Sequence, residues 1–171
     1  MDVGHSCGAS LLPFRTTCKG PVNKTIVMSL SEGTMDIIDE AITYYRANVF
    51  FRNYEIQGGA DRVLVYLTLY ISACLARMER CESQKEADKI MQAYAWESFP
   101  LPGQHGFPFN GFFTKANTQE EAEMFKAYFK QLREETGKRL TEVVFAQEGR
   151  PNKFWVCFSK RRFMNLSLDR A

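Results

Sequence analysis

The chain has 171 residues, of which 45% are hydrophobic and 25% charged, and its formal net charge at pH 7 is +2. These values are ordinary for a globular protein, and they exclude collagen-like, mucin-like and intrinsically disordered chains. The charge is too nearly balanced to indicate a nucleic acid or an anionic membrane as a partner. A chain of this length can fold around one hydrophobic core, so we expect a compact single domain, 1–171.

The first 34 residues are expected to form an extended N-terminal arm (1–34). An apolar patch at 11–15 is followed by Lys19, Gly20 and Pro21 and then by a polar stretch. This composition favours a segment that crosses the surface of the domain in extended form.

The segment 36–49 predicts the first helix. Three acidic residues stand near its start, where they suit the positive end of a helix dipole. Behind them the apolar residues recur at helical spacing, at Ile38, Ala41, Ile42, Tyr45 and Val49.

The most apolar run of the chain, 63–75, predicts the central helix. Its residues are hydrophobic nearly all the way round, so a helix formed here must be covered on every side by other elements. At 13 residues, the run is well short of the roughly 20 needed to cross a bilayer. We therefore expect about five other helices to surround it, with Cys74 packed in the core.

Two later helices are predicted by their start signals. Ser83 with Glu86 and Thr118 with Glu121 have the spacing of a capping box, and each pair opens a run with helical periodicity. Gly137 is expected to end or bend the second of these helices, and the apolar residues after it would then begin another helix.

A final helix is expected over 152–164, where Trp155, Phe158 and Arg162 fall close to one line. No segment shows convincing strand alternation. The fold class predicted from these patterns is all-α, with six helices.

The segment 99–117 is predicted to be an ordered Pro/Gly connector. Its first part, 99–110, holds three prolines and two glycines and cannot be helical, because proline removes a backbone donor and fixes φ. The same stretch carries four large apolar side chains that favour burial, at Phe99, Leu101, Phe107 and Phe109.

The sequence offers no catalytic, cofactor-binding or metal-binding residues that we can name. Its two histidines, His5 and His105, lie in irregular segments, and no two of its five cysteines are spaced for a zinc site. The cysteines are odd in number and widely spread, which favours a reduced, cytosolic protein. Basic neighbours could activate Cys157 as a thiol nucleophile, but between large apolar residues we expect it to be a small core residue. We expect no enzymatic activity.

Charge is distributed unevenly along the chain. From residue 150 onward there are six basic residues and one acid, a net +5, so the first 149 residues carry −3. The six are Arg150, Lys153, Lys160, Arg161, Arg162 and Arg170. Two interpretations remain open: an RNA-binding or adaptor module in which the neighbouring rings stack on bases, or a charged helix face that meets an acidic protein. We favour the protein partner.

Several runs of the sequence resemble the subunit-3 family of the actin-related protein 2/3 complex. The resemblance extends over about 5–168, nearly the whole chain, with its blocks in order and at the expected separations. The matching runs are 11–13, 19–21, 36–42, 45–56, 60–62, 68–72, 99–110, 131–137 and 163–165.

The resemblance implies an all-helical subunit in which one helix is surrounded by the others, without enzymatic activity or a cofactor. It implies a structural role in nucleating branched actin filaments, as part of a hetero-oligomer of seven subunits. The partners implied are the actin-related proteins, the other small subunits and the actin filament, with no nucleic acid and no membrane. The location implied is the cytoplasm and its actin cytoskeleton, at the cell cortex and in projections.

Five residues are candidates for the partner interface. Arg52 and Tyr54 lie in a block that mixes aromatic and charged residues near a helix end, a composition typical of interface cores. Lys160, Arg161 and Arg162 are expected to contact an acidic actin-like surface. For Phe50 and Phe51, beside the first pair, packing within the chain is the favoured interpretation.

Overall fold

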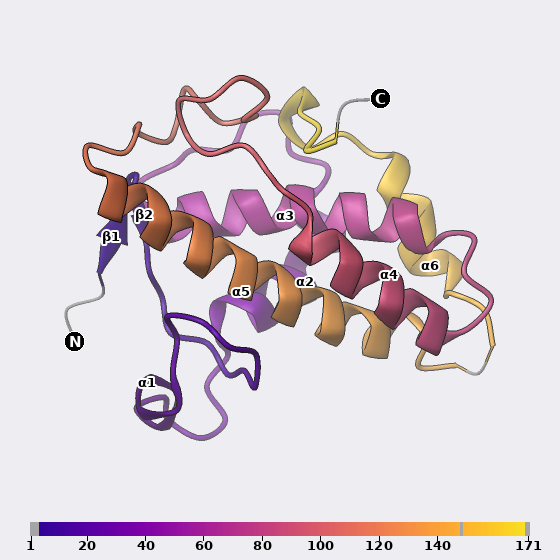
Figure 1. Cartoon of the computed structure of the whole chain (residues 1–171). Helices are drawn as coiled ribbons and strands as arrows, with labels where there is room; N and C mark the ends of the chain where they lie inside the picture. Colours follow the sequence, from indigo (N-terminus) through magenta and orange to yellow (C-terminus); the bar gives the residue numbers. More distant parts are fainter. Residues whose placement is uncertain (1–3, 148, 170–171) are drawn as a thin grey trace.

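The computed structural model describes residues 4–147 and 149–169, and Arg170 lies outside this part. Most of the described chain is helical, which confirms the all-α class (Figure 1). The elements are β1 (His5–Ser6), β2 (Ala9–Ser10), α1 (Lys24–Met28), α2 (Ile37–Asn48), α3 (Gly59–Met78), α4 (Gln84–Trp96), α5 (Gln119–Val144), α6 (Lys153–Val156) and two 3₁₀ helices, η1 (Cys157–Lys160) and η2 (Phe163–Asn165).

Helix α3 forms the centre of the fold, as its composition predicts. Helices α2, α4, α5 and α6 and the 3₁₀ helix η1 all contact it, and residues from Val63 to Ile71 are buried without a break. Cys74 is fully buried, as expected. The helix has 20 residues rather than 13, because its polar ends continue the helix beyond the apolar run.

The full length of α3 removes the reason given above for excluding a membrane span, which was that the 13-residue apolar run is too short. With a mean hydropathy of 1.3 over its most apolar window, the helix is long and apolar enough to span a membrane by length and composition. However, 61% of that window is buried inside the fold. Packing against the neighbouring helices therefore accounts for its apolar character.

The predicted end or bend at Gly137 is wrong. Helix α5 continues through this residue for a total of 26 residues, and its N-cap is Thr118, as the capping signal predicted. Gly137 is buried where α5 packs on α4, and a Cβ atom at this position would lie 3.0 Å from the Cβ of Met91. The glycine thus allows two helices to approach closely instead of ending one of them.

A leucine at position 137 should disrupt this helix contact. We expect Gly137→Leu to lower the free energy of unfolding by about 2 kcal/mol, because the added side chain must push α4 away from α5. Ala127→Leu is the matched control, since Ala127 is exposed on the same helix and should change stability by less than about 0.5 kcal/mol. Urea unfolding measures both variants, and equal stabilities would contradict the close contact.

The N-terminal arm contains short elements that the sequence patterns did not predict. Strands β1 and β2 pair as a small antiparallel hairpin, with His5 opposite Ser10. Helix α1 follows, capped by the side chain of Asn23. The described residues therefore form six α-helices, the predicted number, but α1 is one of the six and the helix predicted after Gly137 is not.

A network of charged side chains fastens the arm to α2 and α5. Arg139 of α5 lies 2.8 Å from the carboxylate of Asp36, 2.9 Å from Asp39 and 2.9 Å from Glu135. From the arm, Arg15 pairs with Asp39 at 2.6 Å, and its carbonyl oxygen accepts a hydrogen bond from Arg139. Burial alone would raise the pKa of the Asp36 carboxyl, but hydrogen bonds from Arg139 and two backbone N–H groups outweigh it, and the pKa is lowered.

The connector between α4 and α5 packs its aromatic side chains into the core. Phe107 and Phe109 are buried, while Phe99 and Leu101 are half-buried. The Phe107 ring lies 6.3 Å from the ring of Phe125 on α5. These contacts hold a segment without regular structure against the N-terminal end of α5.

Candidate protein-interaction surface

The C-terminal segment 153–169 crosses the molecule beside α3 (Figure 1). Trp155 anchors its start. The Trp155 ring stacks on Tyr45 of α2 at a centroid distance of 6.3 Å, and only 8% of Trp155 is exposed. On α2, the guanidinium of Arg46 lies 4.8 Å from the centroid of the same ring. One large side chain therefore connects α6 to α2.

The continuous helix predicted over 152–164 is wrong. Helix α6 has four residues, and after η1 the backbone is extended at Arg161 and Arg162. The reason is tertiary: the backbone N–H of Met164 donates to the carbonyl of Phe51 at 2.9 Å instead of bonding within a helix. Met164 and Asn165 also have positive φ, which ends any helical path.

The structure brings together the two segments that were predicted separately as interface. The Phe50 and Phe158 rings meet edge to face at 5.7 Å, and the Tyr54 and Phe163 rings meet at 6.0 Å. Together with the hydrogen bond from Met164, these contacts join the loop after α2 to the C-terminal segment. We call the result the α2–C-terminal surface, formed by Phe50, Phe51, Arg52, Tyr54, Lys160, Arg161 and Arg162.

The aromatic side chains of this surface are partly exposed and also pack against other rings of the chain. Phe50 and Phe51 are 53% and 48% exposed although both make ring contacts within the chain. Tyr54 is half-buried, and Arg52 is exposed. Two half-exposed phenylalanine rings next to arginine side chains are typical of the centre of a protein interface.

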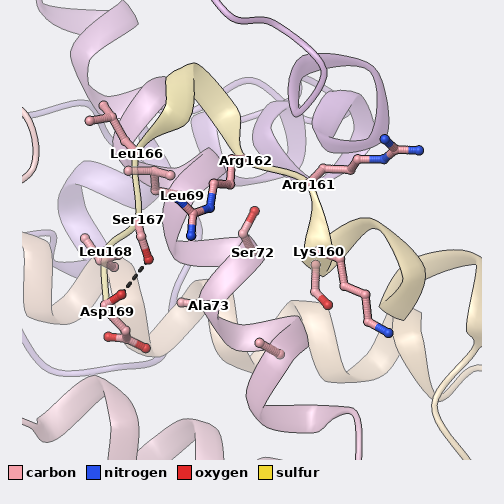
Figure 2. A pocket seen from close by; sticks show the side chains of 12 residues that line it. Leu69, Ser72, Ala73, Lys160, Arg161, Arg162, Leu166, Ser167, Leu168 and Asp169 are labelled. Carbon is pink, nitrogen blue, oxygen red and sulfur yellow. Dashed lines mark hydrogen bonds between the residues drawn. The ribbon is translucent and has the colours of Figure 1, made fainter. Parts of the chain in front are cut away.

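The three basic residues of the surface do not form the row that a helix would give. Figure 2 shows Arg162 directed toward Leu69 and Ser72 of α3, while the Arg161 side chain points away from them. The Arg161 guanidinium lies 5.3 Å from the centroid of the Phe50 ring. Lys160 is 76% exposed by side chain and sits 4.0 Å from Glu79.

Within the C-terminal segment, a groove of about 360 Å³ lies between residues 159–162 and residues 166–169 (Figure 2). Small side chains of α3, Ser72, Ala73 and Ala76, line it together with the basic residues. The opposite wall is 166–169, where Asp169 accepts a hydrogen bond from the Tyr94 hydroxyl at 2.9 Å and pairs with Arg77 at 3.3 Å. No local pattern could reveal these contacts, because Asp169 is 75 residues from Tyr94 and 92 from Arg77.

The expected core position of Cys157 is wrong. The thiol is exposed, because the chain turns from α6 into η1 at this residue. Within residues 4–147 and 149–169, no group of three or more His, Cys, Asp and Glu side chains could hold a metal ion. The chemistry that this surface does offer is positive charge beside partly exposed aromatic rings, which suits binding to a protein.

Known proteins resemble this chain over nearly its whole length. Residues 2–168 match the family described as "P21-Arc: ARP2/3 complex ARPC3 (21 kDa) subunit". The chain is 44% identical over 164 residues to actin-related protein 2/3 complex subunit 3 of Arabidopsis thaliana, covering 96% of this chain and 91% of the relative. It is 42% identical over 168 residues to the subunit of the same name from Schizosaccharomyces pombe, covering 98% and 93% of the two chains. The corresponding protein of Dictyostelium discoideum is 44% identical over 159 residues, covering 92% and 88%.

Proposed function

The chain belongs to the family of the ARPC3 (21 kDa) subunit of the ARP2/3 complex, and from this premise we propose that it serves as a non-catalytic structural subunit that docks through its α2–C-terminal surface. The family resemblance drawn from sequence is thereby confirmed, and with it the role of a structural subunit in this actin-related complex. The choice of surface is supported by the ring contacts of Phe50 with Phe158 and of Tyr54 with Phe163, which join two distant segments. It is also supported by Arg161, whose guanidinium lies 5.3 Å from the centroid of the Phe50 ring.

The partner proposed for this surface is an acidic patch on one of the actin-related subunits. Residues 150–171 carry a net charge of +5, whereas the rest of the chain carries −3. Opposite charges on two proteins steer their encounter and fix their register, so an acidic patch is the complement that this face selects. The aromatic rings would then supply the apolar contact area at the centre.

The wider role follows from the same proposal. The subunit would contribute to the nucleation of branched actin filaments and to contact with the actin filament, alongside the other small subunits of the complex. It would act without nucleic acid or membrane, in the cytoplasm and the actin cytoskeleton. The alternative of a helical RNA-binding module is not supported, because the matching family and its relatives are named as subunits of a protein complex.

Charge reversal tests the proposed surface. We expect Lys160→Glu, Arg161→Glu and Arg162→Glu together to weaken retention in the complex at least about tenfold, with a smaller effect at high salt, because reversal converts attraction into repulsion. Co-purification of the seven-subunit complex at several salt concentrations measures retention, and a branching assay measures function.

The matched control reverses three exposed basic residues elsewhere, with Arg80→Glu, Lys85→Glu and Lys89→Glu. This variant has the same change in net charge and should retain assembly and branching. If the two triple variants behave alike, net charge alone matters and the α2–C-terminal surface is not the docking site.

A further inference from the structure

We propose that a second surface, the groove beside α1, receives an amphipathic helix from a neighbouring subunit, with acidic residues on one flank of that helix and basic residues on the other. The inference rests on the proposed role as a complex subunit and adds a docking site to it. The groove measures about 400 Å³ and runs between the N-terminal arm, α1 and α5. Its lining is mostly apolar and includes Leu11, Pro13, Pro21, Ile26, Met124 and Tyr128.

Helix α1 itself indicates that something covers the groove. It has five residues, far fewer than the 12 to 15 or so that an isolated helix needs in water, and of these only Val27 packs, partly buried, against the core. Three of the five are apolar, and Ile26, which lines the groove, is 38% exposed. Across the groove, Met124 of α5 is 43% exposed. Apolar side chains gathered around one groove mark an interaction site.

The form of the occupant follows from the groove lining. Addition of a strand needs a row of free backbone donors and acceptors, but Pro13 and Pro21 have no N–H group, and β1 and β2 pair with each other. The groove instead offers side chains and a volume within the usual range for a binding pocket. An amphipathic helix uses such a groove by inserting apolar residues spaced three and four apart.

The charged residues on the two sides of the groove determine which charges the incoming helix should carry on each of its flanks. On the arm side, Lys19 and Lys24 are exposed, two residues before Pro21 and one residue before Thr25 of the groove lining, and the only acid between residues 4 and 34 is Glu32. At the α5 edge, Glu120 and Glu123 are exposed, four residues and one residue before Met124. Complementarity therefore places acidic residues of the partner toward α1 and basic residues toward α5.

The groove lies far from the α2–C-terminal surface. In Figure 1, α1 is at the lower left, below the N-terminal end of α5, whereas the C-terminal segment is at the upper right beside α3. Two partners can therefore bind without competing for the same face. A chain with both sites would hold two neighbours at a fixed separation.

Hydrogen exchange in the assembled complex tests whether the groove is covered. We expect the backbone amides of α1 to exchange at least about tenfold more slowly in the seven-subunit complex than in the isolated chain, because the covering helix must leave before they open. Equal exchange rates would overturn the inference while leaving the role as a subunit intact. Failure of the chain to assemble at all would overturn both.

Substitutions test the chemistry of the occupant. Ile26→Asp with Met124→Asp should weaken retention in the complex at least about tenfold, because two carboxylates would enter an apolar contact. Phe112→Asp with Val143→Asp is the matched control, since those side chains are exposed to nearly the same extent, 37% and 38%, outside the groove. Thermal unfolding of the isolated variants verifies that both remain folded. Equal retention of the two variants would overturn the inference.

Single charge reversals test the two flanks separately. Lys24→Glu and Glu123→Lys should each weaken retention, and each effect should shrink at high salt. If either reversal strengthens retention, the flanks of the partner are not oppositely charged, and the proposed occupant is wrong. A photo-crosslinker at position 26 then identifies the bound segment. Crosslinking to a second copy of this chain, or to a non-helical segment, would also overturn the proposal.

Discussion

Replacing Arg139 with methionine should lower the free energy of unfolding by about 3 kcal/mol. Arg139 is 16% exposed by side chain, and the Asp36 carboxylate that it pairs with is completely buried. Methionine preserves much of the apolar stem but leaves a buried negative charge without its main partner. Removing one partner of a buried ion pair lowers the free energy of unfolding far more than replacing both partners with apolar residues, because the remaining charge stays out of water.

Two controls separate this effect from the loss of any ion pair. Lys160→Met breaks the exposed contact with Glu79 and should cost less than about 0.5 kcal/mol. Adding Asp36→Asn to the Arg139→Met chain should recover part of the loss, because the orphaned charge is removed. Urea unfolding measures all the variants, and a loss below about 1 kcal/mol for Arg139→Met would contradict the importance of the buried pair.

Acid should reduce the difference between the parent chain and Arg139→Met. The folded-state pKa of Asp36 lies below its ordinary value of 3.8, so the stability that its charge provides is fully present above that value and is lost as the pH falls through the lowered pKa. Below that pKa Asp36 is protonated in both chains, and the two stabilities converge.

Replacing Trp155 with alanine should release the C-terminal segment from α2. We expect a loss of about 3 kcal/mol in the free energy of unfolding, because a nearly buried indole and its stack on Tyr45 are both removed. Amide exchange across 153–169 should accelerate more than exchange in α5, since Trp155 anchors the start of the segment. Retention in the complex should fall as well, because the two halves of the α2–C-terminal surface would no longer be held together.

The residue before Trp155 provides a closely matched control. Phe154 is 74% exposed, so Phe154→Ala should change stability by less than about 0.5 kcal/mol and leave the exchange of the segment unchanged. If Trp155→Ala and Phe154→Ala lower stability equally, the stack on Tyr45 does not anchor the segment.

The helices that were predicted well are those whose signals are local. The capping residues Ser83 and Thr118 both accept the hydrogen bond that their spacing implies. The apolar spacing behind Asp36 likewise predicts α2 closely, and Asp36 is the N-cap. In each case a few neighbouring residues determine where the helix begins, so a single sequence is enough to locate it.

The features that were missed depend on partners distant in the sequence. Gly137 looks like a helix end until Met91 of α4 is seen beside it. The C-terminal segment has helical spacing, but the contact between Met164 and Phe51 competes successfully with a helix. The candidate surface was predicted only in its parts, because nothing local shows that Phe50 meets Phe158. The interface roles of Arg52, Tyr54, Lys160, Arg161 and Arg162 remain predictions.

The position of α3 in the chain has a consequence for biosynthesis. The ribosome completes this apolar helix at residue 78, but the last residue of α5, which helps to cover it, follows 66 residues later at position 144. At a synthesis rate of roughly 5–20 residues per second, α5 is completed about 3–13 s after α3. Until α5 is complete, the part of α3 that it covers has no partner, so we expect the yield of folded chain in cells to depend on chaperone capacity as well as on the stability of the finished fold.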